Sequence, residues 1–291
     1  MTPTFIDDEI ASQPQTWAEA ARVADRVSNL LPAPGERVAF VGCGTSWFVG
    51  MAAAARRESL GLGETDAFAA SEFPMGRAYD RVVAISRSGT TTEIIDLLAR
   101  LKGATTLITA VADSPAAAHA DGVIDLAFAD EQSVVQTRFA TSVLALVRRN
   151  FGEELDPVIE DANAALAINI NQLTAVDQCT FIASGWAVGL TYEAALKTRE
   201  AAQFWAESYP AMDYRHGPIA IAQPARLVWS LGGTPEGLDE VVTATGARFV
   251  SHDIDPLAAL IVAQRFAVAV AKAKGLDPDR PRSLTRSVVL T

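Results

Sequence analysis

The chain has 291 residues, of which 49% are hydrophobic and 20% are charged, a composition typical of folded domains. Its formal net charge of −11 at pH 7 argues against nucleic-acid binding, because neutralising phosphates requires a basic face. Two cysteines and three widely separated histidines form neither a disulfide framework nor a local metal motif, so we expect no metal and no organic cofactor.

The chain begins with an acidic segment, MTPTFIDD, that lacks the basic flank and apolar run of a signal peptide. No apolar segment is expected to reach the roughly 18 residues that cross a membrane. We therefore expect a cytoplasmic protein. The length favours two domains, since a domain usually has about 100–200 residues.

In the first half, short segments rich in β-branched residues alternate with longer helical segments. Alternation of this kind predicts a parallel sheet with helices on both faces. The predicted strands are residues 37–41, 65–69, 81–85, 105–110 and 123–128. The predicted helices are residues 47–60, 91–101 and 139–149.

The second half repeats this alternation after a segment of mostly helical pattern at residues 151–176. A tail is expected at residues 276–291, with turns at Pro278 and Pro281. The predicted strands are residues 180–183, 226–231 and 248–251, and the predicted helices are residues 190–204 and 256–274.

The two halves also resemble each other in sequence. FVGCG at residues 40–44 matches FIASG at residues 181–185, and SEF at residues 71–73 matches MDY at residues 212–214 with the same offset. Chance is a fair rival for either match alone, but two matches in register indicate a duplicated unit.

We therefore predict an α/β fold with two tandem, doubly wound (flavodoxin-like) parallel-sheet domains. The first is expected at residues 20–152 and the second at residues 176–291, with a helical linker at residues 153–175. Only the first contains the serine- and threonine-rich segment described next, so the halves are expected to be specialised.

The segment SRSGTTT at residues 86–92 follows a predicted strand and opens a predicted helix. Backbone N–H groups at a helix start favour an anion, and this position is where an open α/β sheet binds its ligand. An ordinary helix cap needs one hydroxyl, whereas this segment has five. The surplus predicts a phosphate site, to which Arg87 adds charge if it points inward. The segment lacks the Gly-Lys-Ser/Thr of a nucleotide loop, which argues against ATP or GTP.

A second turn, GCGTS at residues 42–46, occupies the same position after the first strand. It fails as a dinucleotide fingerprint because Trp47 stands where the third glycine is required. We expect Thr45 or Ser46 to donate hydrogen bonds to sugar hydroxyls. Cys43 has no partner base in the sequence and is expected to be a small buried residue.

Acid–base residues cluster on the predicted helix of the second half. Glu193, Lys197 and Glu200 lie at positions i, i+4 and i+7 and so share one face. A solvated helix face is the ordinary alternative. His216 follows in a turn, RHGP, that could aim an imidazole into a cleft. Carboxylate, ammonium and imidazole groups together suit the ring opening and proton transfer of aldose–ketose interconversion.

Taken together, these motifs resemble those of the SIS (sugar isomerase) domain proteins, and most closely the isomerase half of glucosamine-6-phosphate synthase. The resemblance extends from about residue 36 to the end of the chain, and five motifs in the family's order are far more specific than one. They are GCGTS at residues 42–46, SRSGTT at 86–91, EAALK at 193–197, RHGP at 215–218 and PRSLTRSV at 281–288.

The resemblance implies roles for residues by position. The phosphate would be held by Ser86, the backbone of Arg87, Ser88 and Thr91, and the remaining substrate-binding residues would be Gly44, Thr45, Ser46, Val134, Gln136 and Arg286. Glu200 would move the proton between the first two carbons, with Glu193 and Lys197 as supporting site residues. His216 would open the sugar ring from the neighbouring subunit, so the resemblance implies a homodimer.

Three departures from the family pattern bear on the reaction. Thr2, not a cysteine, follows Met1, so we expect no glutaminase domain here. The tail lysine that forms a Schiff base in the family is Arg286, which stays protonated and cannot form an imine. Arg87 and Thr90 replace the glutamine and glutamate common in the phosphate loop. These departures make a glutamine-dependent synthase the least expected chemistry.

We therefore expect an aldose–ketose isomerase or an amino-sugar-phosphate deaminase that acts on a hexose or hexosamine 6-phosphate. Two alternatives stay open. One is a non-catalytic phosphosugar sensor, and the other is a fructosamine-6-phosphate deglycase, which would release an amino acid instead of ammonia.

Overall fold

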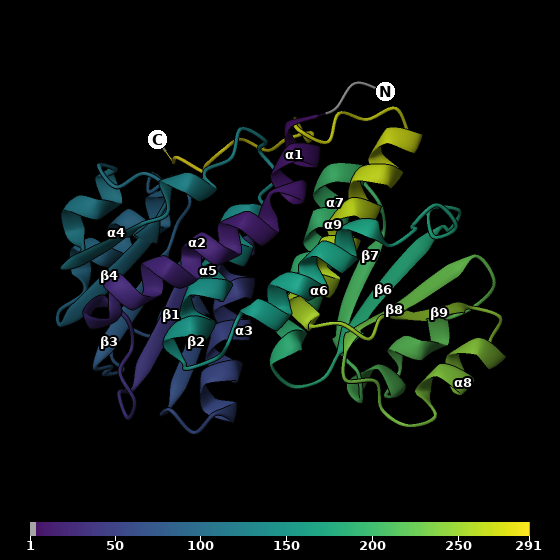
Figure 1. The fold of residues 1–291 in the computed structure, drawn as a ribbon, viewed down its shortest axis with the longest axis horizontal. Helices are drawn as coiled ribbons and strands as arrows, with labels where there is room; N and C mark the ends of the chain where they lie inside the picture. Colours follow the sequence, from purple (N-terminus) through teal and green to yellow (C-terminus); the bar gives the residue numbers. More distant parts are fainter. Residues whose placement is uncertain (1–3, 291) are drawn as a thin grey trace.

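Two parallel β-sheets, one in each half of the chain, form the framework of the computed structural model, which describes residues 4–290 (Figure 1). The first sheet has five strands, and its three inner strands are buried over most of their length because helices cover both faces. In spatial order the five strands are β2 (Thr65–Ala69), β1 (Val38–Gly42), β3 (Arg81–Ile85), β4 (Ala104–Thr109) and β5 (Gly122–Asp125).

The second sheet repeats the order of the first four strands of the first sheet. Its strands, in spatial order, are β7 (Ala206–Pro210), β6 (Gln178–Ala183), β8 (Arg226–Gly232) and β9 (Arg248–Ser251). The predicted fold class is therefore confirmed. The sequence analysis missed β7, a strand whose Glu207 and Pro210 weaken its β-pattern.

Helices cover each sheet on two sides. The helices of the first half are α2 (Gln13–Arg26), α3 (Thr45–Ser59), α4 (Thr92–Arg100) and α5 (Arg138–Asn150). Helix α4 packs on the opposite face of the first sheet from α2, α3 and α5. The helices that remain are α1 (Phe5–Ala11), α6 (Asp156–Ala167), α7 (Val188–Ala202), α8 (Leu238–Ala244) and α9 (Pro256–Ala273).

The two halves share one hydrophobic core, in which α3 of the first half packs against α7 of the second. The two helices approach closely at Gly189, where an added Cβ would lie 2.6 Å from backbone atoms of Phe48 and Ala52. Since α3 and α7 each follow the first strand of their sheet, this contact places the predicted sugar turn beside the predicted acid–base helix.

Some predicted boundaries are wrong. The segment 151–176 is helical only over α6, because Ile168 adopts an extended conformation and the following residues form turns. Strand β5 ends at Asp125, not at Phe128, because Ala127–Ala129 form a 3₁₀ turn. The N-terminal helices α1 and α2 and the short helix α8 were not predicted.

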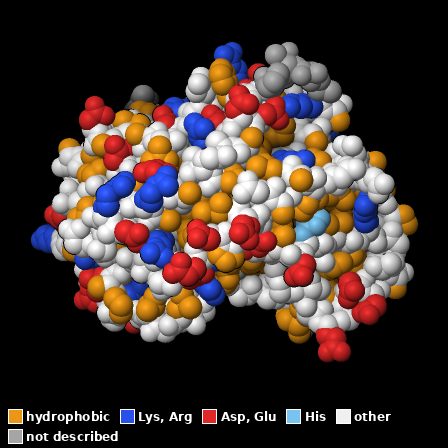
Figure 2. All heavy atoms as spheres, viewed as in Figure 1, with side chains coloured by type: hydrophobic (Ala, Val, Ile, Leu, Met, Phe, Trp, Pro, Cys, Tyr) orange, Lys and Arg blue, Asp and Glu red, His pale blue; other side chains and the backbone are white. Residues whose placement is uncertain are grey.

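Helix α9 is long and apolar enough to cross a membrane by length and composition, so the expectation that no segment reaches this length is wrong. However, 72% of the helix is buried inside the protein, where it packs against α7 and α6, and a core helix passes the same test. Basic and acidic side chains intermingle on the face shown in Figure 2, so its described residues form no continuous basic strip.

Candidate active site

The segment Ser86–Thr92 forms a tight loop between β3 and α4, as the sequence predicts. Gly89 has a φ of +61°, and a Cβ at this position would lie 1.9 Å from Oγ of Ser114. Only glycine fits here, because both the backbone conformation and the close approach exclude a side chain. The loop hydroxyls order it further: Ser86 Oγ accepts from Gly89 N at 3.2 Å, and Ser88 Oγ accepts from Thr90 N at 3.2 Å.

A small cavity of about 30 Å³ lies inside this loop. Ser46 at the start of α3 also lines it, so both predicted turns contribute. The residues around it that were predicted to bind substrate are Ser46, Ser86, Arg87, Ser88, Thr91, Gln136 and Arg286. The cavity lies at the N-terminus of α4, where the helix dipole favours a bound anion, although the N–H of Thr92 already donates to the carbonyl of Val288 at 3.2 Å.

The Arg87 side chain is directed into the protein. Its guanidinium is 1% exposed and lies 3.3 Å from Oε2 of Glu131. It also donates to the carbonyls of Ser133, Val134 and Arg286, at 3.0, 3.3 and 3.0 Å. The idea that Arg87 adds its charge to an anion site is therefore wrong, because that charge is balanced by Glu131. Arg87 instead joins the Ser86–Thr92 loop to two other cavity-lining segments.

A larger cavity of about 170 Å³ adjoins the small one. The two share the residues Cys43, Thr91, Gln136 and Arg286. The predicted site residues that line the larger cavity are Gly44, Thr45, Thr91, Val134, Gln136, Lys197, Glu200 and Arg286. The tertiary structure thus brings both predicted turns, helix α7 and the C-terminal tail to one place.

Helix α7 buries its acid–base face. Lys197 Nζ lies 2.5 Å from Glu200 Oε2 and 3.7 Å from Glu193 Oε1. The side chains of Lys197 and Glu193 are 2% and 1% exposed, whereas that of Glu200 is 18% exposed and reaches the cavity. The alternative of a solvated helix face is therefore wrong.

Burial raises the pKa of Glu193 to about 8, although the nearby Lys197 acts in the opposite direction. Burial alone would lower the pKa of Lys197, but Glu193 and Glu200 outweigh it and raise that pKa. Near neutral pH, Lys197 is thus a fixed cation that Glu200 balances, and Glu193 behind it is mostly an uncharged acid.

The tail residues lie across the Ser86–Thr92 loop. Thr90 Oγ1 donates to Ser287 Oγ at 2.8 Å, and Leu290 N donates to Thr92 Oγ1 at 2.9 Å. Arg286 pairs with Asp130 at 2.5 Å and donates to the carbonyl of Glu131, so its side chain is only partly available to a substrate. The tail therefore covers the cavities.

The sequence analysis missed Glu93, in the first turn of α4. Its side chain lines the larger cavity, and its Oε2 is buried without a hydrogen-bond partner among the described residues. Gln136 Oε1 is likewise buried without a hydrogen-bond partner among the described residues. Burial, helped by the charge of Glu93, raises the pKa of Cys43 to about 11, which keeps it a thiol. The position of Glu93 directly after the Ser86–Thr92 segment is the signal that could have found it.

His216 is exposed and lines neither cavity. Its backbone N donates to Asp213 O at 2.8 Å, which holds the turn. A role for His216 at this chain's own cavities therefore has no support within residues 4–290. Among the same residues, no group of three or more His, Cys, Asp and Glu side chains is placed to hold a metal ion.

Comparison with known proteins relates this chain to the SIS domain and to enzymes that are named for sugar phosphates. Residues 33–148 match the family model described as the SIS domain. The chain is 28% identical to the glutamine–fructose-6-phosphate aminotransferase (isomerizing) of Methanothermobacter thermautotrophicus, over 98% of the chain and 57% of that relative. The chain thus spans little more than half the length of the curated relatives it matches.

Solved structures share the fold. A glucosamine-6-phosphate deaminase from Thermotoga maritima matches with a TM-score of 0.79 and 24% identity, covering 99% of this chain and 100% of that one. A tagatose-6-phosphate ketose/aldose isomerase from Escherichia coli matches with a TM-score of 0.78 and 19% identity, covering 97% of each chain. At these identities the likeness shows the fold alone.

Proposed function

We propose that this protein is an enzyme that interconverts the aldose and ketose forms of a hexose 6-phosphate, or removes the amine of a hexosamine 6-phosphate, through an enediol-type proton transfer. One observation carries the proposal. The Ser86–Thr92 loop and the Lys197–Glu200 pair line adjoining cavities that share four residues. A phosphate at the loop places a sugar chain in the larger cavity, beside a carboxylate and an ammonium group.

The phosphate would bind in the small cavity. The hydroxyls of Ser86, Ser88 and Thr91 would supply neutral donors, and the dipole of α4 favours the negative charge. The backbone of Arg87 would take part, while its side chain holds the loop. Thr45, at the N-terminus of α3, would face the sugar hydroxyls from the other side.

The proton transfer would use Glu200. Its carboxylate reaches the cavity, and Lys197 holds it by an ion pair. A general base must approach the carbon-bound proton to within hydrogen-bonding reach, so a fixed carboxylate at the cavity wall suits this task. Lys197 would also stabilise the negative charge that develops on the enediol oxygens. Glu193, uncharged near pH 7, leaves the Lys197 charge available to Glu200 and substrate.

Ring opening would use His216, which lines neither cavity of its own chain. His216 is exposed, so it is free to reach the cavity of a second subunit. We therefore propose a homodimer in which His216 completes the partner's site. Arg286 would bind substrate as a fixed cation and cannot form an imine, which favours isomerase or deaminase chemistry over synthase chemistry.

A deglycase is the second candidate, and one feature favours it. An open hollow of about 460 Å³ adjoins the larger cavity at Glu200 and Leu284. Arg199, Trp205 and Arg282 line this hollow and offer two cations and an aromatic face. The amino-acid part of a fructosamine 6-phosphate carries a carboxylate that would fit such a wall.

The test is a panel of 6-phosphates: glucose, fructose, glucosamine and a fructosamine conjugate. Ketose formation, ammonia release and amino-acid release distinguish the three reactions. Glu200→Gln should lower turnover by about 100- to 10,000-fold while substrate affinity changes little. Glu240→Gln, on an exposed position of α8, is the matched control and should behave as the wild type.

Each other result rejects a part of the proposal. Binding without any turnover by the wild type would leave the sensor interpretation. Full turnover by Glu200→Gln would remove Glu200 from the mechanism. If no member of the panel binds, the sugar-phosphate proposal is wrong.

A further inference from the structure

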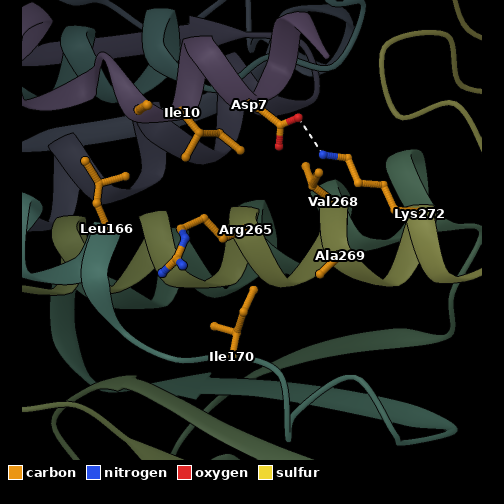
Figure 3. Close-up of a pocket in the computed structure, with 9 residues that line it drawn as sticks. Asp7, Ile10, Leu166, Ile170, Arg265, Val268, Ala269 and Lys272 are labelled. Atoms are coloured by element: carbon orange, nitrogen blue, oxygen red, sulfur yellow. Dashed lines mark hydrogen bonds and ion pairs between the residues drawn. The ribbon is translucent and has the colours of Figure 1, made fainter. Parts of the chain in front are cut away.

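A separate cavity of about 380 Å³ lies between α1, α6 and α9 (Figure 3). None of the residues that line it lines the candidate active site. Its volume falls within the range of about 300–1,000 Å³ typical of small-molecule sites. Nothing in the proposed isomerase or deaminase reaction uses it.

The walls of this cavity, which we call the α1–α9 cavity, are mainly apolar. Ile10 projects from α1, Val268 and Ala269 from α9, and Leu166 and Ile170 from α6 and the segment after it (Figure 3). A ligand that binds here needs an apolar body, because a wholly polar molecule would lose its hydration against these side chains.

The polar groups of the cavity carry a surplus of positive charge. Lys272 Nζ lies 2.5 Å from Asp7 Oδ2, so these two charges balance each other. Arg265 has no carboxylate within ion-pair distance among residues 4–290. The surplus of one positive charge lies inside a protein whose net charge is −11.

Two backbone carbonyls hold the Arg265 side chain in place. Its Nη1 donates to the carbonyls of Ala165 and Ile168 at the end of α6, both at 2.8 Å. These bonds fix the guanidinium but use only one of its nitrogens, and the group has five N–H donors. Burial without an acidic partner lowers the pKa of Arg265. A ligand with one anionic group would supply the missing partner.

Helix α1 connects this cavity to the candidate active site. Asp7 and Ile10 face the cavity, while Glu9 on another side of the same helix is buried. Glu9 Oε1 accepts from the backbone N of Gln132 at 2.6 Å and of Ser133 at 3.2 Å. These two residues immediately precede Val134, which lines the larger active-site cavity.

A second connection runs through Asp279. Its carboxylate accepts from the backbone N of Phe5 and Ile6, both at 2.9 Å, and so holds the start of α1. Its carbonyl accepts from Val134 N at 3.0 Å. Asp279 belongs to the tail, of which residues 284–288 line the larger cavity. A shift of α1 therefore acts on both the segment and the tail that line that site.

We propose that the α1–α9 cavity is an effector site for a small amphipathic monoanion, with an apolar ring or short chain and one carboxylate, sulfonate or similar group. The apolar part lies between Ile10, Leu166 and Val268, and the anionic group pairs with Arg265. Occupancy changes the two hydrogen bonds by which Glu9 of α1 binds the backbone of Gln132 and Ser133. Through these residues it changes the position of Val134 in the candidate active site.

The binding test uses 1-naphthalenesulfonate as the probe, with uncharged 1-naphthalenemethanol for comparison. Calorimetry should show one site per chain, and a crystal soaked with the probe should show it beside Arg265. Ala269→Phe fills the cavity and should abolish binding, and Arg265→Met should weaken sulfonate binding at least tenfold but alcohol binding much less. Arg248→Met, an arginine outside the cavity that also donates to a backbone carbonyl, is the matched control.

The coupling test is amide hydrogen exchange, which needs no knowledge of the sugar substrate. The probe should change the exchange rates of Gln132 and Ser133 by at least about threefold in the wild type and not in Ala269→Phe. If the wild type binds no probe, or both cavity variants bind it as the wild type does, the site is refuted. Binding without any change in these exchange rates would refute its action on the active site.

Discussion

Lys197 Nζ lies 2.5 Å from Oε2 of Glu200, one turn further along α7, and this ion pair forms the wall of the larger cavity. The pair extends from the buried interior to the cavity, because the Lys197 side chain is buried and the Glu200 side chain reaches the open space. On its inner side Lys197 also faces Glu193, so one cation serves two carboxyl groups. The acid–base behaviour of the site depends on this arrangement.

Replacing Lys197 by methionine should destabilise the protein, because it leaves Glu193 buried without a cation. Breaking a buried pair costs up to about 3–5 kcal/mol in the free energy of unfolding. The loss should be larger at pH 9 than at pH 6, since a carboxyl whose pKa is about 8 is uncharged at the lower pH. Denaturant unfolding of the wild type and the variant at both pH values measures this loss in the free energy of unfolding.

The double variant Lys197→Met/Glu193→Gln is the control for this prediction. It removes the buried acid, so most of the extra loss at pH 9 should disappear, and the cycle of variants gives the coupling energy. An equal loss at pH 6 and pH 9 for the single variant would contradict the assignment.

Stability should also depend on Glu9. Burial, with the charge of Glu131 beside it, raises the pKa of Glu9 to about 7. The folded protein therefore keeps this proton up to about pH 7, while the unfolded chain releases it near pH 4.5. The free energy of unfolding should fall as pH rises through this window, by at most about 1.4 kcal/mol per pH unit.

Glu9→Gln should flatten this slope between pH 5 and pH 7, because the glutamine does not titrate. Asp8→Asn, an exposed neighbour on the same helix, should leave the slope unchanged. Urea unfolding across the pH range measures the slopes, and identical slopes for wild type and Glu9→Gln would show that Glu9 does not titrate in this window.

Gly89→Ala should damage the phosphate loop. A left-handed backbone costs a non-glycine residue roughly 1–2 kcal/mol, and the Cβ would also meet Ser114 Oγ at 1.9 Å. We expect a loss of at least about 2 kcal/mol in stability and a loss of at least tenfold in affinity for inorganic phosphate. Gly76→Ala, where an added Cβ meets nothing within 4 Å, is the control. Unchanged phosphate affinity in Gly89→Ala would exclude the loop as the anion site.

Arg286→Lys should introduce the amine that this chain lacks in its tail. Incubation with fructose 6-phosphate and borohydride should then trap one covalent adduct per chain, detected by mass spectrometry, whereas the wild type should give none. Arg280→Lys, an exposed tail position, controls for non-specific reaction. A trapped adduct in the wild type would show that a different lysine forms the imine and that Arg286 is not the decisive departure.

The sequence by itself determined most of the strands, the longer helices of the two sheets and the local turns. Runs such as Arg81–Ile85 are strands because β-branched residues fit a sheet buried on both faces. Parallel strands end at one edge, so the loops after β1 and β3 had to lie near each other. The tight Ser86–Thr92 loop and the shared face of Glu193, Lys197 and Glu200 follow from such local rules.

Only the tertiary structure decided which partners these groups meet. It buries Lys197 and Glu193 where the helix pattern equally allowed a solvated face, and it turns Arg87 toward Glu131, 44 residues away in the chain. It also brings Ser287 into hydrogen-bonding contact with Thr90, 197 residues away in the chain. The α1–α9 cavity likewise forms between helices that are distant in sequence. Contacts between residues so distant in sequence depend on how whole helices and sheets pack, and no local propensity encodes them.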